Sequence, residues 1–145
     1  MPFVDAISLL APMKNEFPEK LSKVEQYLRG RKDIAFGYLF GSLARGLATA
    51  LSDIDIAVYL TGKKTPDKRL EILGDLIDIF KTDKVDLVIL NTAPLSLKMR
   101  ILKGRKVIAD NVPFIRHAFE STTIRNSLDF SKIENCILEK RYLHG

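Results

Sequence analysis

The chain has 145 residues, a formal net charge of +5 from 23 basic and 18 acidic side chains, and 46% hydrophobic residues. This length suits one domain with one core, and the composition is that of a globular protein rather than a disordered one. No apolar run reaches the roughly 18 residues needed to span a bilayer. The single cysteine, Cys136, excludes an internal disulfide. The mild positive charge suits a nucleotide, a nucleic acid or an acidic partner without selecting among them.

The N-terminal segment favours a cytoplasmic protein. Its short apolar stretch is interrupted by Asp5, and no basic segment precedes it as one would in a secretory signal. We find no repeat and no interdomain linker. We therefore expect a single domain over residues 1–145, with its core at about 34–110 and a helical C-terminal segment at about 112–143.

The hydrophobic pattern predicts alternating helices and strands. Gly30 and Gly104 are expected to end helices, and Thr65 with Pro66 to begin one. In chain order we predict a helix at 15–30, a strand at 34–40, a short helix from Ser42, a strand at 53–60, a helix from Pro66, a strand at 85–90, a helix at 94–103, a strand at 106–109 and helix over most of 112–143. This order is typical of an α/β (mixed α+β) fold, a small sheet of about four strands covered by helices. The pattern leaves open whether the sheet is parallel or mixed.

Three aspartates lie in two of the predicted strands. The run GSLARGLATALSDIDIAVY, residues 41–59, places Asp53 and Asp55 ten residues after a Gly-Ser pair. Side chains at i and i+2 of a strand project from one face, so the two carboxylates are expected side by side. Asp86 sits in the next apolar strand, KVDLVIL. If that strand lies beside the first, Asp86 faces the Asp53/Asp55 pair.

Carboxylates gathered in this way favour a hard cation such as Mg²⁺. Three of them on adjacent strands can hold two divalent ions about 3.5–4 Å apart, and Asp86 can accept the proton of an attacking hydroxyl. Gly41 permits close approach of a phosphate, while Ser42 offers a hydroxyl and a backbone N–H. Arg45 is either a third phosphate contact or a surface charge. Each motif alone is common, but their combination predicts metal-dependent chemistry on a nucleoside triphosphate.

At Gly41-Ser42, Asp53, Asp55 and Asp86 the chain resembles the minimal nucleotidyltransferases of the DNA polymerase beta-like superfamily. The segment FGSLARGLATALSDIDIAV is similar to the antitoxin type encoded beside a HEPN toxin. The resemblance implies ATP as cosubstrate, two Mg²⁺ ions, and transfer of AMP to a tyrosine of the HEPN ribonuclease. It also implies that Asp53 and Asp55 bind both metals, that Asp86 completes the site of the attacking hydroxyl, and that Gly41 and Ser42 bind the triphosphate.

Two alternatives stay open at this point. The protein can act as a non-catalytic antitoxin by forming a complex, with Ile133, Ile137, Leu138 and Tyr142 of the C-terminal segment as a candidate interface. It can also transfer nucleotides to a small molecule or an RNA. The small size favours an acceptor that is brought by a partner protein, because little chain remains for an acceptor-binding domain.

Overall fold

The computed structural model describes residues 17–46, 53–62 and 65–143, with side chains up to residue 130. The N-terminal segment with Asp5, and the C-terminal side chains suggested as an interface, lie outside this description. The elements are a first helix at 17–29, β1 (Ile34–Phe40), β2 (Ile54–Leu60), α2 (Pro66–Phe80), β3 (Val85–Ile89), the 3₁₀ turn η1 (Leu90–Thr92), α3 (Leu95–Lys103), β4 (Lys106–Asp110) and α4 (Pro113–Leu143). Among the described residues, no helix has the length and apolar character that a membrane crossing requires.

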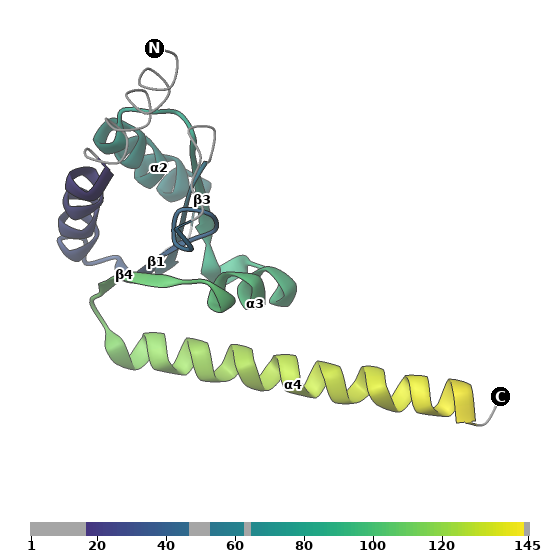
Figure 1. Cartoon of the computed structure of the whole chain (residues 1–145). Coiled ribbons are helices and arrows are strands. Elements are labelled where there is room, and N and C mark those ends of the chain that lie inside the picture. Colours follow the sequence, from purple (N-terminus) through teal and green to yellow (C-terminus); the bar gives the residue numbers. More distant parts are fainter. Residues whose placement is uncertain (1–16, 47–52, 63–64, 144–145) are drawn as a thin grey trace, which may run out of the picture.

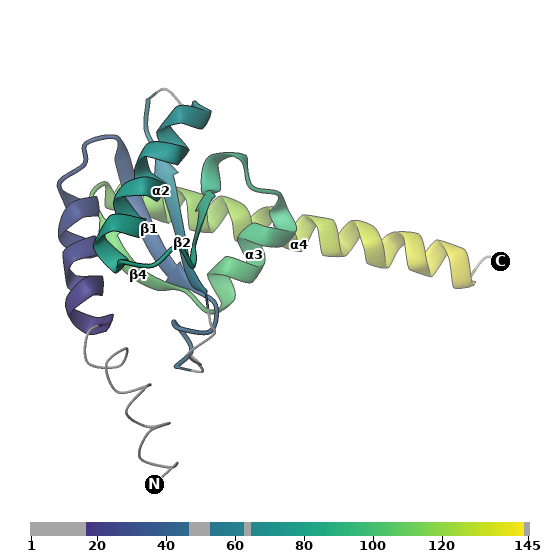
Figure 2. The ribbon, with the colours of Figure 1, turned by 90° about the horizontal axis from the view of Figure 1, so that it is seen from above.

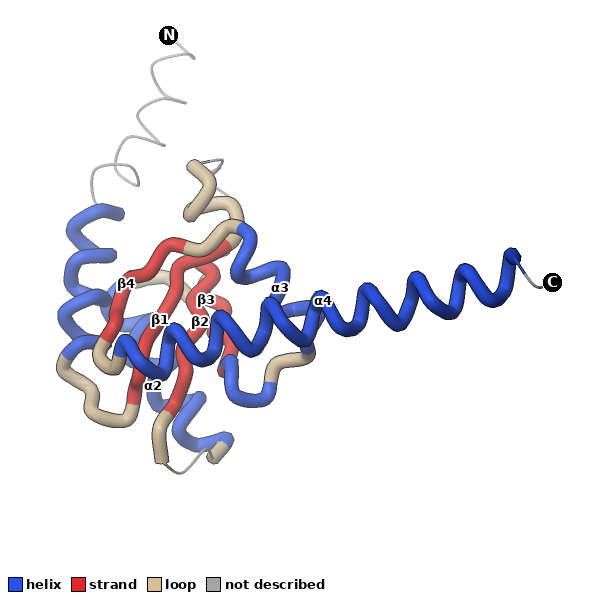
Figure 3. Tube along the Cα trace, turned by 90° about the horizontal axis from the view of Figure 1, so that it is seen from below, coloured by secondary structure: helices blue, strands red, loops and turns tan. Residues whose placement is uncertain are grey.

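The elements form three layers. The first helix and α2 cover one face of the sheet, and α3 and α4 lie on the other (Figure 1). Seen from the α4 side, this long helix crosses the strands and then continues past the edge of the sheet (Figure 3). Its C-terminal part therefore projects away from the body of the molecule (Figure 2).

The sheet is mixed, which the sequence pattern left undecided. Its strand order is β3-β2-β1-β4. The β1 strand runs antiparallel to both β2 and β4, while β2 and β3 are parallel. Parallel neighbours need a crossover connection, and α2 supplies it between β2 and β3. This crossover brings the starts of β2 and β3, where the aspartates lie, to the same end of the sheet.

Alternation along the strands divides the core between the two faces. Ile54, Ile56 and Val58 of β2 pack with residues of the first helix and α2. Ala57 of β2 belongs to the other cluster, with residues of α3 and with side chains of α4 packed against it. Because Asp55 has the same parity as Ala57, its side chain projects on the α3/α4 face. The hydrophobic pattern thus fixes the face on which the candidate site lies.

Most predicted boundaries are confirmed within two residues, while the short helix expected after Gly41 is wrong. The segment after Gly41 forms hydrogen-bonded turns over 42–46 rather than a short helix beginning at Ser42. The second strand begins at Ile54, so Asp53 precedes the ladder. The third strand ends at Ile89, because the chain turns into η1 at Leu90. The start of α2 is as predicted: the Thr65 side chain accepts a hydrogen bond from the Lys68 N–H, and Pro66 occupies the first turn.

The α4 helix is fixed to the sheet by polar contacts at its start. The Asn111 side chain, just before the helix, donates to the carbonyl oxygens of Leu28 and Ile34, each at 2.9 Å. Glu120 on α4 accepts from the Tyr38 hydroxyl of β1 at 2.7 Å and from Arg105 at 3.1 Å. These contacts tie the start of α4 to β1 and to the end of the first helix, which holds the layer opposite α2 in place.

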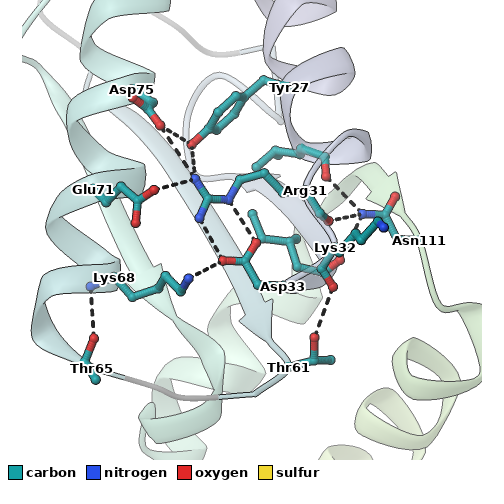
Figure 4. A network of polar contacts seen from close by, with 12 residues as sticks. Tyr27, Arg31, Lys32, Asp33, Thr61, Thr65, Lys68, Glu71, Asp75 and Asn111 are labelled. Atoms are coloured by element: carbon teal, nitrogen blue, oxygen red, sulfur yellow. Dashed lines mark hydrogen bonds and ion pairs between the residues drawn. The ribbon is translucent and has the colours of Figure 1, made fainter.

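A second polar network joins the first helix, the loop before β1 and α2 (Figure 4). The Arg31 guanidinium makes a two-pronged contact with Asp33, at 2.9 and 2.7 Å. Lys68 of α2 approaches the same carboxylate at 2.8 Å. The hydrogen bond from Arg31, reinforced by Lys68, holds the pKa of Asp33 well below its usual range. Charge-assisted bonds of this kind are stronger than neutral ones.

We expect Asp33→Asn to destabilise the protein at neutral pH and to matter less in acid. A lowered pKa means that the stabilising contribution is fully present above the unfolded-state pKa of about 3.9 and is lost progressively as the pH falls from there through the much lower folded-state pKa. The urea midpoints of the wild type and the variant should therefore differ most near neutral pH, and the difference should narrow steadily below about pH 4. Asp78→Asn, an exposed position on α2, is the control. Parallel pH profiles for the Asp33 variant and the wild type would contradict this account.

Candidate active site

Two of the predicted carboxylates are direct neighbours across the parallel strands. Asp55 of β2 is in register with Asp86 of β3. Equal parity places both on the α3/α4 face. Asp55 is partly buried, while Asp86 and Asp53 are exposed. The structure thus confirms the expectation that the third aspartate stands beside the Asp-x-Asp strand.

Gly41 lies directly against Asp55. Its φ of +76° is in the left-handed region, which residues with a side chain rarely adopt. A Cβ atom at this position would overlap the Asp55 Oδ2 atom and stand 3.2 Å from Cγ. Backbone conformation and contact with the carboxylate therefore both require glycine here. The Gly-Ser turn and the Asp-x-Asp strand form one structural unit.

A cavity of about 250 Å³ opens in front of this pair. Its walls combine carboxylates, cations and apolar side chains. They are formed by Phe40, Gly41, Arg45, Asp55, Asp86, Val88, Leu97 and Arg100. Arg45 comes from the turn that follows Gly41, and Arg100 from α3. The cavity can therefore take a ligand that carries negative charge on one side and binds cations on the other.

The electrostatics of the cavity disfavour a bare carboxylate at Asp55. Burial raises the pKa of Asp55, and the negative charges of Asp86 and Asp53 raise it further. Arg100 opposes this shift. A group of carboxylates that repel one another in a partly buried place is the arrangement in which a bound cation gains most.

The residues fit a divalent cation by their chemistry, although they do not form a finished cage. The oxygen donors of Asp55 and Asp86 are those that Mg²⁺ prefers, and Gly41 keeps the space beside Asp55 free of a side chain. In the part of the chain that the structure describes, no group of three or more His, Cys, Asp or Glu side chains is arranged to hold a metal ion. Since like charges repel, closer approach of the three carboxylates would require the cation itself.

The other predicted residues lie around this centre at different distances. Asp53 lines a second, shallow cavity of about 270 Å³, which it shares with Asp86. Asp86 thus belongs to both cavities and links Asp53 to Asp55. Ser42 is exposed in the turn beside Gly41 and is in neither cavity lining. A larger groove of about 360 Å³, between α3 and α4, contains none of the predicted residues.

Arg100 is the residue of the cavity that the sequence pattern missed. It lies in the last turn of α3, three residues after Leu97, which lines the same cavity. The available signal was a basic residue on the helix that follows the third aspartate strand. Such a signal is weak, because basic residues near helix C-termini are common for reasons of the helix dipole alone.

Solved structures with this fold include toxin-antitoxin complexes. One chain of a toxin-antitoxin crystal structure with AMP-PNP is 25% identical, with a TM-score of 0.66, covering 84% of this chain and 95% of that one. A chain of a mutant of the toxin-antitoxin MntA-HpeT is also 25% identical, with a TM-score of 0.68, and the match covers 83% of this chain and 96% of that one. A tri-AMPylated HEPN toxin of Shewanella oneidensis in complex with its MNT antitoxin contains a chain of 24% identity and TM-score 0.64, with 85% and 96% covered, which supports the fold alone.

Sequence comparison gives the family. A protein of Methanocaldococcus jannaschii, named as a putative protein adenylyltransferase, is 35% identical over 98 residues, which are 67% of this chain and 74% of that protein. The family described as polymerase beta nucleotidyltransferase matches residues 22–113, more than half of the chain. The match spans β1 to β4, including every residue of the cavity. The chain belongs to the polymerase beta nucleotidyltransferase family.

Proposed function

We propose that this protein is a Mg²⁺-dependent adenylyltransferase that transfers AMP from ATP to a tyrosine hydroxyl of a partner HEPN ribonuclease toxin, and so acts as its antitoxin. The observation that carries the proposal is the in-register pair of Asp55 and Asp86, packed against Gly41 in a cavity that also contains two arginines. This arrangement suits a substrate that is both a polyanion and a ligand of divalent cations.

The comparisons support the particular reaction. The relative at 35% identity carries the name of a protein adenylyltransferase. Two neighbours at 25% identity are toxin-antitoxin structures, one of them with AMP-PNP. An ATP analogue and a toxin partner in similar proteins are what an AMP-transferring antitoxin needs.

The residues divide between the two halves of the reaction. The tyrosine oxygen attacks the α-phosphorus of ATP, its bond to that phosphorus forms, and the bond to pyrophosphate breaks while the phenolic proton passes to the Asp86 carboxylate. We place Asp53, Asp55 and Asp86 as the ligands of two Mg²⁺ ions, which when bound neutralise phosphate charge. Gly41, Ser42 and Arg45 lie on the triphosphate side, where backbone N–H groups and a cation suit phosphate oxygens.

Intact mass spectrometry tests this function directly. The full chain is mixed with ATP, Mg²⁺ and the product of the neighbouring gene, which the proposal takes to be the HEPN toxin, and both proteins are weighed. We expect the HEPN protein to gain one or more AMP units, and peptide mapping to place them on tyrosine. The gain should disappear with Asp53→Asn and persist with Asp78→Asn, which removes a carboxylate on the exposed surface of α2.

The other outcomes separate the alternatives. A stable complex of the two proteins without any mass gain would contradict AMP transfer and favour a non-catalytic antitoxin. If the HEPN protein gains no mass and forms no complex with this chain, the proposed partner is contradicted. The acceptor would then be sought among RNA and small molecules. Addition of AMP to a residue other than tyrosine would keep the enzyme and correct its target.

A further inference from the structure

The last turn of α3 brings a cation to the carboxylates. Leu97 and Arg100 lie three residues apart, so they share one face of α3, and both line the cavity of Asp55 and Asp86. Arg100 is close enough for its charge to act on Asp55. The surface of α3 that faces the cavity is therefore apolar at one position and positively charged at the next.

Arg45 reaches the same cavity by lying across the end of α3. A Cβ atom at Gly104, the residue that ends α3, would stand only 2.9 Å from the Arg45 Nε atom. The φ of Gly104 is −130°, a region open to any residue. Backbone conformation therefore does not require glycine at this position. The absence of a side chain at Gly104 leaves the space that the Arg45 side chain occupies.

The guanidinium groups of Arg45 and Arg100 are not paired with any side chain that the structure describes. Among the side chains that the structure describes, neither Arg45 nor Arg100 makes an ion pair or a hydrogen bond. By contrast, Arg31 and Arg116 are engaged in ion pairs at 2.7 and 3.0 Å. Arg45 and Arg100, which are both exposed, thus keep their donors for a ligand, whereas the partly buried Arg31 and Arg116 use theirs to hold the fold together.

We propose that Arg100, together with Arg45 packed against Gly104, binds the β- and γ-phosphates of the nucleoside triphosphate and holds the pyrophosphate leaving group. This inference rests on the proposed function and names the residues that recognise its phosphate side. The guanidinium fork matches phosphate oxygens in geometry as well as in charge. Negative charge accumulates on pyrophosphate as its bond to the α-phosphorus breaks, so fixed cations at this place stabilise the transition state.

Equilibrium binding of ATP and AMP to the full chain in the presence of Mg²⁺ tests the role of Arg100. We expect Arg100→Met to weaken ATP binding by about tenfold or more and to leave AMP binding unchanged, because only the outer phosphates lose a charge-assisted contact. Arg100→Lys, which keeps the charge but not the fork, should fall between. Lys103→Met is the matched control: it removes a charge from the same helical turn, outside the cavity lining.

The outcomes distinguish this inference from the proposed function. Equal ATP affinity of the wild type and Arg100→Met would overturn the role of Arg100 while leaving the function intact. Equal losses of ATP and AMP affinity would also overturn it, since the contact would then not be with the outer phosphates. A wild type that binds no ATP would contradict the proposed function itself.

A double-mutant cycle tests whether Gly104 positions Arg45 for ATP binding. Gly104→Ala should displace Arg45 and weaken ATP binding, with the fold checked by thermal unfolding. If the loss acts through Arg45, then Gly104→Ala combined with Arg45→Met should bind ATP no more weakly than Arg45→Met alone. Additive losses of ATP affinity in the double variant would contradict the role of Gly104 in positioning Arg45.

Discussion

Replacement of Asp55 by Asn is expected to abolish AMP transfer while making the protein more stable at neutral pH. The activity should fall by roughly a thousandfold or more, the size of loss seen when a central group of a catalytic site is removed. Asn keeps the shape of the side chain but provides neither the negative charge nor the two equivalent oxygens that a divalent cation needs. Intact mass spectrometry of the partner gives the activity, and thermal unfolding gives the stability.

The gain in stability follows from the direction of the pKa shift. Burial and the neighbouring carboxylates raise the pKa of Asp55. A raised pKa means that the group contributes stability below its unfolded-state pKa and loses it as the pH rises through the folded-state value. Ionised Asp55 therefore destabilises the fold at neutral pH, and a neutral amide does not. The difference in Tm between variant and wild type should open as the pH rises above about 4 and close below it.

Addition of Mg²⁺ provides an independent comparison in the same experiment. A ligand that binds only the folded state raises its stability in proportion to the logarithm of its concentration above Kd. We expect Mg²⁺ with ATP to raise the Tm of the wild type and to have little effect on Asp55→Asn. Asp78→Asn, on the exposed surface of α2, should behave like the wild type throughout. Full transfer activity in the Asp55 variant would contradict the site.

The centre of the site was predictable because it depends on pairing rules. Once the apolar runs of β2 and β3 are identified, the helix between them favours parallel pairing, and parallel pairing in register sets Asp86 beside Asp55. Strand parity then places both on one face. The sequence pattern left the adjacency of the two strands as a condition and their register open, and the structure supplies both.

The edge of the site was not predictable in the same way. Arg100 enters the cavity only because α3 is rotated about its axis so that Leu97 and Arg100 face the carboxylates, and this rotation is set by packing of Ile101 and Leu102 on the sheet. The segment after Gly41 was predicted to begin a short helix at Ser42, but it forms hydrogen-bonded turns over 42–46. Contact between Arg45 and Gly104 depends on tertiary structure, which propensity does not encode.

Gly41→Ala adds only one methyl group, but it is expected to cause a large loss of AMP transfer. The left-handed backbone costs a residue with a side chain about 1–2 kcal/mol, and the new methyl group would in addition overlap the Asp55 carboxylate. Asp55 must then move, and displacement of a reacting group by about 1 Å can cost roughly a hundredfold in rate. We therefore expect a modest loss of stability and a large loss of AMP transfer, measured by urea unfolding and by mass spectrometry of the partner.

Gly62→Ala separates the two causes, because Gly62 has a similar backbone conformation in open space. Its φ is +86°, and apart from its own chain neighbours no atom of the described residues lies within 4 Å of the position that its Cβ would occupy. The substitution at Gly62 should carry the backbone cost alone, with transfer activity retained. If Gly41→Ala and Gly62→Ala lose activity equally, backbone strain and not contact with Asp55 explains the effect. A selective loss at Gly41 would show that the Gly-Ser turn acts on the reaction by fixing the position of the Asp55 carboxylate.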